Sequence, residues 1–296
     1  MRRILITGGA GQIGSELQAL DWPSDVRLDA PSRADLTLTH AGTVHSSFAQ
    51  QSYVLVINTA AFTAVDKAED EVAEAFAANA LVPAILADAC RTANIPLIQV
   101  STDYVFNGSK SDWYAESDPT DPQGVYGASK RAGELAALVG NPRTLVLRTA
   151  WVFSPYRANF VKTMLRVGRE TGLVRVVADQ IGCPTSAADI ARAIRHIALR
   201  YLEGADGPCG IYHFVNKGEA SWHDFAREIF LQAESMGGPG VEVEAISTAD
   251  YPTRARRPAN SRLSTLGLVR DFGIAPRPWQ EALSETLTTL SDRNEI

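Results

Sequence analysis

Near its start the chain reads Ile4-Leu5-Ile6-Thr7-Gly8-Gly9-Ala10-Gly11-Gln12-Ile13-Gly14. The apolar residues in front predict a short buried strand, and the spacing of Ile13 and Leu17 is typical of one helix face. Gly8, Gly11 and Gly14 permit a tight turn, close approach of a pyrophosphate and close packing of helix on strand. The helix N-terminus offers N–H groups and a favourable dipole to an anion. This strand–turn–helix context favours a dinucleotide-binding loop over a merely tight turn.

Beyond this loop, short β-branched runs alternate with longer helical segments. Further strands are expected at residues 26–28, 53–58, 96–101, 144–147 and 174–177. Helices are expected at residues 71–91, with a kink or break at Pro83, and at residues 127–138. This alternation predicts an α/β fold with a doubly wound, Rossmann-type parallel sheet covered by helices on both faces.

After about residue 215 the pattern changes. Ser221 is a plausible N-cap for a helix over residues 221–233, with Asp224 three residues on. A Gly-rich turn, a Pro- and Arg-rich stretch at 252–258 and a closing helix at 279–290 follow. We therefore expect a smaller C-terminal α/β substrate lobe, formed by about 149–172 and 216–296. The NADP(H)-binding domain would comprise 1–148 and about 173–215.

The composition excludes several classes of protein. The 296 residues include 28 basic and 34 acidic side chains, a net charge of −6, which argues against general binding of nucleic acid. Cys90, Cys183 and Cys209 are widely spaced and contain no CxxC pair, so we expect neither a disulfide framework nor a thiolate metal site. The N-terminus lacks a signal-peptide pattern, and no apolar run is expected to span a membrane. A cytoplasmic protein is the expectation.

The end of the second strand bears on the choice of cofactor. Asp29 could bind a ribose hydroxyl, which favours NAD, whereas Ser32-Arg33 could clamp a 2′-phosphate, which favours NADP. We favour NADP(H) and leave NAD(H) open. The alternative for Arg33 is a solvated loop residue.

A catalytic group is predicted where the fourth strand and a later helix meet the ligand edge of the sheet. Tyr126 and Lys130 are four residues apart and share one helix face. An ammonium can lower the pKa of the phenol and hold a cofactor ribose hydroxyl, while the phenol exchanges a proton with a carbinol oxygen. Ser101-Thr102-Asp103-Tyr104 ends the fourth strand, so Thr102 could bind a substrate carbonyl beside the tyrosine.

At this point the chain resembles the dTDP-4-dehydrorhamnose reductase family of extended short-chain dehydrogenases/reductases. The resemblance covers nearly the whole chain. Two blocks are more specific than the superfamily motifs, namely Asp179-Gln180-Ile181-Gly182-Cys183-Pro184-Thr185 and Arg256-Arg257-Pro258-Ala259-Asn260-Ser261-Arg262-Leu263. Matches of lower specificity lie at 8–14, 58–69, 101–106, 125–130, 148–153 and 159–160.

The resemblance implies NADPH-dependent reduction of the C4 ketone of dTDP-4-dehydro-L-rhamnose, or of a close dTDP-4-keto-6-deoxy sugar. It makes Tyr126 the proton donor, Lys130 its partner and Thr102 the carbonyl-binding hydroxyl. The implied cofactor contacts are Gly11, Gln12, Ile13, Asp35, Leu36, Ala61, Phe62 and Thr63. The implied substrate contacts are Asp103, Tyr104 and Trp151, although Trp151 could instead be an aromatic core residue.

Four arginines, at positions 254, 256, 257 and 262, lie close together in an otherwise acidic chain. Arginine clamps phosphate oxygens bidentately, so this stretch could bind a nucleotide diphosphate. A solvated loop with local salt bridges is the alternative. The resemblance favours the ligand, with Arg257 and Asn260 as the first candidates. Some members of the family bind Mg²⁺ between two subunits, so a homodimer and a metal ion are open, but no ligands are assigned.

The same residues bear on other reactions and roles. Sugar-nucleotide dehydratases carry an acid where this chain has Tyr104, which disfavours elimination, and the 4-epimerases lack the Arg-Arg-Pro block. A relative of the family serves as a non-catalytic, NADP-binding regulatory subunit of another enzyme. The intact set of Thr102, Tyr126 and Lys130 favours a reductase over that binding role.

Overall fold

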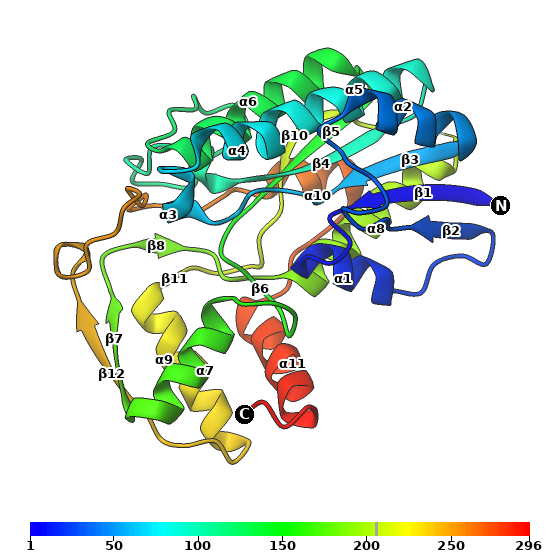
Figure 1. Cartoon of the computed structure of the whole chain (residues 1–296). Coiled ribbons are helices and arrows are strands. Elements are labelled where there is room, and N and C mark those ends of the chain that lie inside the picture. Colours follow the sequence, from blue (N-terminus) through cyan, green and yellow to red (C-terminus); the bar gives the residue numbers. More distant parts are fainter. Residues whose placement is uncertain (205–206) are drawn as a thin grey trace.

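The computed structural model describes residues 1–204 and 207–296 and has a six-stranded parallel sheet as its framework (Figure 1). The strand order is β10-β5-β4-β3-β1-β2, which confirms the predicted Rossmann-type fold. The order reverses between β1 and β3, where parallel sheets bind ligands at the carboxyl ends of their strands. The strands are β1 (Arg2–Thr7), β2 (Val26–Asp29), β3 (Tyr53–Asn58), β4 (Leu97–Thr102), β5 (Thr144–Thr149) and β10 (Gly210–His213).

Helices cover both faces of this sheet, because its central strands are apolar on both sides. One core joins the sheet to α1 (Gln12–Ala19), α8 (Ala187–Leu202) and α10 (Leu266–Phe272). The opposite core joins it to α2 (Ala41–Gln50), α5 (Val82–Thr92) and α6 (Val125–Gly140). In Figure 1 the α2, α5 and α6 layer lies above the sheet, and α1 and α8 lie below it.

The helix expected at 71–91 is interrupted, and the interruption precedes Pro83. It consists of α4 (Val72–Phe76), a π turn η1 (Ala77–Leu81) and α5. Proline has no N–H to continue the hydrogen-bond ladder, and a widened turn is one way to accommodate that loss. The run Val72–Thr92 is also long and apolar enough to cross a membrane by composition, contrary to expectation. In this fold it belongs to the helix layer, with Ile85, Leu86 and Cys90 buried in the core.

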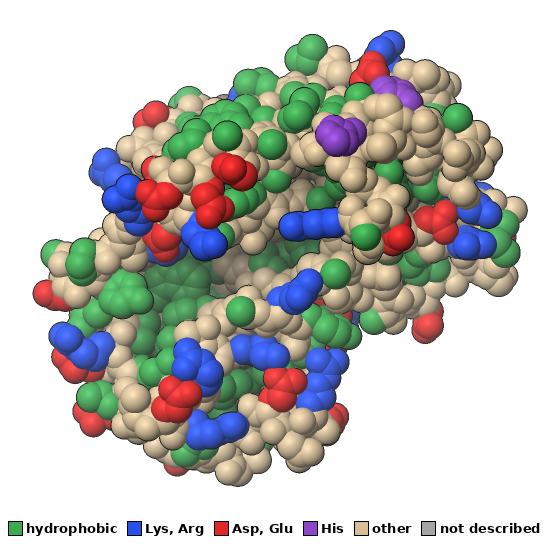
Figure 2. Space-filling view, viewed as in Figure 1, with side chains coloured by type: hydrophobic (Ala, Val, Ile, Leu, Met, Phe, Trp, Pro, Cys, Tyr) green, Lys and Arg blue, Asp and Glu red, His purple; other side chains and the backbone are tan. Residues whose placement is uncertain are grey.

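A smaller lobe is built from α7 (Phe160–Thr171), α9 (Trp222–Ser235) and α11 (Trp279–Asp292) around an aromatic core. Ser221 and Asp224 form the predicted capping box at the start of α9. Three short strand pairs complete the lobe and its junction with the sheet: β7 (Leu173–Val177) with β12 (Glu242–Ile246), β8 (Ile181–Gly182) with β11 (Ala220–Ser221), and β6 (Val152–Phe153) with β9 (Thr185–Ser186). The space-filling view shows a hollow between the lobe and the sheet (Figure 2).

One strand assignment from the sequence is wrong. Residues 174–177 do not form the sixth strand of the large sheet, because β7 pairs with β12 in the lobe and β10 takes the sheet edge. Leu173 and Arg175 are exposed, whereas every residue of β4 and β5 is buried, so β7 has the open face of a small surface sheet. We propose the predicted two-part division with residues 173–177 moved to the lobe.

A buried ion pair connects α6 to the sheet. Arg148 on β5 donates to both carboxylate oxygens of Glu134, at 2.8 Å each, and the two side chains are 1% and 0% exposed. The Arg148 guanidinium also lies 5.0 Å from the ring centre of Phe106. This geometry satisfies the charge on both partners and fixes the helix at one height along the sheet.

We expect Glu134→Ala to lower the free energy of unfolding by about 3–5 kcal/mol, because it leaves the Arg148 cation buried and unpaired. Urea denaturation measures this loss. Glu170→Ala is the control, since it breaks only the exposed pair with Arg166 and should change stability by no more than about 0.5 kcal/mol. Equal small effects of both substitutions would contradict the role of the buried pair.

Candidate active site

The glycine-rich loop has the close contacts that the sequence predicts. Gly8 has φ +73°, and a Cβ there would lie 2.5 Å from the Ala60 nitrogen. A Cβ on Gly14 would lie 2.4 Å from the carbonyl oxygen of Gly8. Helix α1 begins at Gln12 with no side-chain cap, so its first N–H groups have no side-chain partner. The loop therefore keeps the space and the donors that an anion such as a pyrophosphate requires.

A buried polar ladder holds the strand ends behind this loop, and sequence reasoning missed it. Thr7 donates to the amide oxygen of Asn58 at 2.5 Å, and Asn58 donates to Gln99 at 2.6 Å. The amide oxygen of Asn58 also accepts the N–H of Ala60 at 3.1 Å. These bonds cross β1, β3 and β4, so they fix the loop after β3 relative to the glycine loop. Polar residues near the ends of three apolar strands were the available signal.

The loop with the predicted cofactor contacts Ala61, Phe62 and Thr63 is held by Asn79. Asn79 accepts the N–H of Phe62 at 2.8 Å and donates to the Phe62 carbonyl at 3.0 Å. It also donates to the Ser129 hydroxyl on α6 at 3.0 Å. Asn79 lies in the π turn and is 1% exposed, so the π turn joins the loop to α6.

The three predicted catalytic side chains come from the end of β4 and the start of α6; Thr102 and Lys130 are buried, and Tyr126 is half-buried. Tyr126 and Lys130 lie on the first turns of α6, and the Tyr126 phenol lies near the Thr102 hydroxyl at the end of β4. Lys130 donates to the Val100 carbonyl at 2.8 Å. A Cβ on Gly127 would lie 2.2 Å from the Tyr104 carbonyl oxygen, so only glycine lets α6 approach the turn after β4 this closely.

Burial sets the protonation of this group. It raises the pKa of Tyr126 above the ordinary range of a phenol, and the nearby Thr102 hydroxyl offsets only part of that rise. Burial lowers the pKa of Lys130 to about 8, and the carboxylate of Glu134 opposes this shift. The phenol therefore stays protonated at neutral pH, as a proton donor must.

The catalytic helix is capped by a residue far away in the sequence. Glu69, which follows α3 (Val65–Ala68), accepts the N–H of Val125 at 2.8 Å. A Cβ on Gly124 would lie 2.6 Å from that carboxylate oxygen, so the contact needs glycine before the helix. A carboxylate at a helix N-terminus satisfies a free donor and is favoured by the dipole. Glu69 lay within the block of resemblance at 58–69, but its partner was not readable from the sequence.

Arg257 is placed at the site, between α3 and η2 (Asp103–Val105). It donates to the Tyr104 hydroxyl at 3.1 Å and to Asp66 at 2.7 Å. Burial, with the charge of Asp103 as the next cause, raises the pKa of Tyr104 to about 12, so its hydroxyl stays neutral. Asn260 differs: its amide donates to the carbonyls of Lys110 and Asp112 and accepts from the backbone of Arg262. It therefore holds loops together, and its predicted contact with substrate stays a prediction.

Trp151 packs in the aromatic cluster, in line with the alternative left open for it. Its indole stacks on Trp222 with ring centres 3.5 Å apart and planes 8° apart. Trp151 has φ +48°, and a Cβ on Gly182 would lie 2.4 Å from its ring. Its backbone lies in the left-handed region, an arrangement that costs about 1–3 kcal/mol unless surrounding contacts enforce it. Contact with a sugar stays a prediction.

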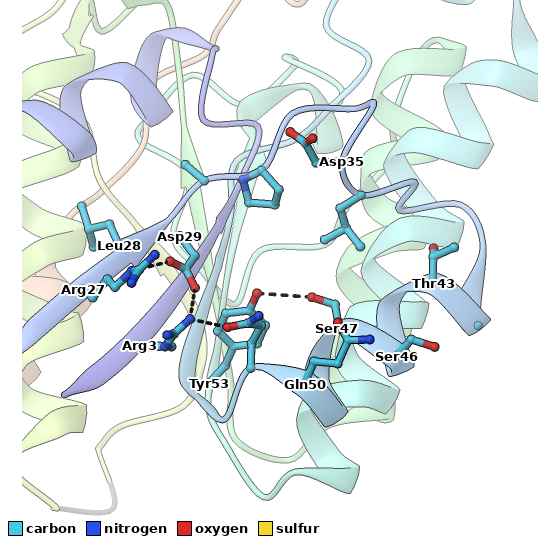
Figure 3. Close-up of a pocket in the computed structure, with 15 residues that line it drawn as sticks. Arg3, Arg27, Leu28, Asp29, Asp35, Thr43, Ser46, Ser47, Gln50 and Tyr53 are labelled. Atoms are coloured by element: carbon cyan, nitrogen blue, oxygen red, sulfur yellow. Dashed lines mark hydrogen bonds and ion pairs between the residues drawn. The ribbon is translucent and has the colours of Figure 1, made fainter.

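A cavity of about 710 Å³ lies at the end of β2 and is lined by Asp29, Asp35 and Leu36, three of the predicted cofactor contacts (Figure 3). Figure 3 shows Asp29 joined to Arg3 and Arg27. The Ser32 hydroxyl donates to Asp35 at 2.6 Å and closes the turn. Arg33 is exposed on this turn, and within the described ranges its side chain has no hydrogen bond or ion pair.

The lobe also contacts the glycine-rich loop. Ser154 donates to the amide oxygen of Gln12 at 2.9 Å, and the Arg157 Nε donates to the Ala10 carbonyl at 2.7 Å. Arg157 has φ +58°, a strained value for a residue with a side chain. Sequence reasoning missed Arg157. Across residues 1–204 and 207–296, no three His, Cys, Asp or Glu side chains are grouped to hold a metal ion.

A Rossmann-type sheet, an anion-binding glycine loop at its switch point and a buried Thr–Tyr–Lys group define a nicotinamide-dependent reductase of the extended short-chain type. The comparisons with known proteins agree with this class. The family model described as "RmlD substrate binding domain" matches residues 1–292. The chain therefore belongs to the RmlD family, the dTDP-4-dehydrorhamnose reductases.

Individual relatives show the same. A dTDP-4-dehydrorhamnose reductase of Sinorhizobium fredii is 45% identical over 281 residues, which cover 95% of each chain. A crystal structure of such a reductase from Clostridium acetobutylicum is 36% identical, with a TM-score of 0.91 over 98% of this chain and 99% of that one. A Bacillus anthracis reductase in complex with NADP is 33% identical, with a TM-score of 0.90 and the same coverage. The fold and the family expected from the sequence are confirmed.

We expect Lys130→Met to raise the free energy of unfolding by about 2 kcal/mol at about pH 7, although it removes a predicted catalytic group. The lowered pKa of Lys130 means that burying its ammonium destabilises the folded state. This loss of stability is fully present below pH about 8. That cost disappears as the pH rises toward the ordinary lysine value of 10.5, so the gain should vanish there.

Urea denaturation at both pH values measures this difference. Lys67→Met, at an exposed position, is the control and should leave stability nearly unchanged at either pH. A Lys130→Met protein less stable than the parent at about pH 7 would contradict the assigned cost of burial.

Proposed function

We propose that this chain reduces the C4 ketone of dTDP-4-dehydro-L-rhamnose, or of a close dTDP-4-keto-6-deoxy sugar, with NADPH as reductant. The observation that carries the proposal is the meeting of Thr102, Tyr126 and Lys130 where the end of β4 lies against the start of α6. The family membership supports the sugar nucleotide as substrate.

The reaction uses the protein groups as follows. The bound cofactor supplies a hydride to the ketone carbon. Tyr126 donates its phenolic proton to the carbonyl oxygen as that oxygen gains charge, and the Lys130 ammonium stabilises the phenolate that remains. Thr102 binds the same oxygen and orients the ketone. Exclusion of water strengthens each of these interactions, and Thr102 and Lys130 are both buried.

The diphosphate of the sugar nucleotide would bind near Arg257. This guanidinium uses one nitrogen on Asp66 and another on Tyr104, and it keeps 27% of its side chain exposed. Arginine that is already oriented loses less freedom when it clamps a phosphate. Arg254 is held beside it by Asp70, which keeps a second cation in the same loop.

NADPH is the proposed cofactor, with NADH as the alternative. Support comes from the NADP-bound relative, the glycine-rich loop and the exposed Arg33 beyond β2, whose guanidinium could meet a 2′-phosphate. Arg157 is proposed to meet the pyrophosphate, since its Nε already donates to the Ala10 carbonyl and leaves both terminal nitrogens for an anion.

We expect Tyr126→Phe to lower turnover by at least about 100-fold while NADPH affinity is kept, because only the proton donor is lost. The assay follows the absorbance of reduced nicotinamide, with dTDP-4-dehydro-L-rhamnose made in the same tube by the preceding pathway enzymes. Tyr251→Phe, at a surface position, is the matched control. Parent-like turnover by the Tyr126 variant would overturn the assigned role.

The two arginines should behave differently toward the two cofactors. Arg33→Ala should weaken NADPH binding by about tenfold and leave NADH binding unchanged, since only NADPH has a 2′-phosphate. Arg157→Ala should weaken both by a similar factor, since both share the pyrophosphate. Fluorescence titrations with each cofactor measure this. Arg166→Ala, on the exposed face of α7, is the control. An unchanged affinity of the Arg157 variant for both cofactors would remove Arg157 from the site.

A further inference from the structure

The Thr102 hydroxyl lies between a carboxylate that accepts its proton and a backbone N–H that donates to its oxygen. It donates to Asp103 Oδ1 at 2.9 Å and accepts a longer bond, of 3.3 Å, from the N–H of Tyr104. It also lies near the Tyr126 phenol, whose pKa it lowers. A hydroxyl has one proton, so the direction in which Thr102 donates depends on what Asp103 presents to it.

The protonation state of Asp103 decides where the Thr102 proton points. When Asp103 is ionised it can only accept, so the Thr102 proton points at the carboxylate and away from any substrate. When Asp103 is protonated, its O–H can donate to Thr102, and the Thr102 proton becomes free to point outward. Only the second state lets Thr102 donate to a ketone oxygen, as the reduction requires.

The surroundings of Asp103 make its protonated state easier to populate than that of an ordinary aspartate. Asp103 is 3% exposed, its Oδ2 has no hydrogen-bond partner of good geometry, and it forms no ion pair within the described residues. Burial raises the pKa of Asp103 to about 6, although the hydroxyls of Ser261 and Thr102 lower it in part.

The titratable groups that face Asp103 leave it without a counter-charge. Tyr104 lies beside it on η2, Tyr126 on α6 and the Cys183 thiol between β8 and β9. Burial raises the pKa of each of these three groups, so all are neutral at neutral pH. Arg257, the cation that contacts Tyr104, is itself held by Asp66 and by the Tyr104 hydroxyl.

We propose that Asp103 is a positioning residue that must hold a proton for Thr102 to donate to the substrate ketone. This rests on the proposed function and gives Asp103 a role beyond lining the site. Asp103 neither loses nor gains a proton during the step: the ketone carbon gains a hydride, its oxygen takes the proton of Tyr126, and Asp103 keeps Thr102 turned toward that oxygen.

The test is the dependence of turnover on pH, with NADPH and the keto sugar saturating. The parent should lose turnover about tenfold per pH unit above the pKa of Asp103. Asp103→Asn should lose this decline up to about pH 8, where Lys130 still holds its proton, because its amide N–H donates to Thr102 at every pH. Asp103→Asn made in a Thr102→Val background should have no further effect on the profile, because Asp103 acts through the hydroxyl.

An unchanged decline in Asp103→Asn, in a protein whose thermal unfolding and NADPH affinity match the parent, overturns the proposal. So does a uniform loss of rate at every pH with the decline retained, since that is the effect of a merely structural residue.

Infrared difference spectra between about pH 5 and about pH 8, taken without sugar, give a readout that does not depend on turnover. A protonated-carboxyl band should titrate above the ordinary aspartate range, disappear in Asp103→Asn and shift in Thr102→Val. Its absence overturns the proposal even if the parent reduces the sugar. Its presence in a protein that does not reduce the sugar supports the protonated Asp103 and instead overturns the proposed function.

Discussion

The inner face of α6 is polar where a helix packed on a sheet is ordinarily apolar, and the site depends on this face. Ser129, Lys130 and Glu134 are all buried, and each finds a partner on another element. Apolar packing would tolerate small slips of the helix along the sheet, whereas a buried hydrogen bond or ion pair has one satisfactory geometry. The helix therefore sacrifices some stability and gains a single position for Tyr126.

Much of the fold could be predicted because its signals are local. The glycine spacing, the apolar strands and the Ser221 capping box each depend on residues within a few positions of one another. The edge strand could not be predicted, because β10 contains Gly210 and His213 and is selected by pairing with β5. Residues 174–177 have the sequence pattern of a strand, but the pattern does not say which strand they pair with, so they were assigned to the wrong sheet.

The residues of the candidate site also differ in whether local sequence signals could predict them. Tyr126 and Lys130 could be predicted because their spacing on one helix carries the chemistry. Glu69 and Asn79 could not be predicted, because their partners follow from the tertiary fold alone. The partner of Glu69 lies 56 positions away in the sequence, and those of Asn79 lie 17 and 50 positions away. Asp103 was predicted as a site residue, but the direction of its hydrogen bond to Thr102 needed coordinates.

The short helix α3 connects the two ends of the site. Glu69, at its end, caps the helix that presents Tyr126, and Asp66, one turn earlier, holds Arg257. Tyr126, the proposed proton donor, and Arg257, the proposed diphosphate anchor, are therefore both positioned by one turn of backbone, which fixes the distance between them. Because that distance is fixed, the site would select a ketone by how far its carbonyl lies from the diphosphate. The site would accept a carbonyl at one ring position and reject its regioisomers, whatever hydroxyl groups the sugar carries.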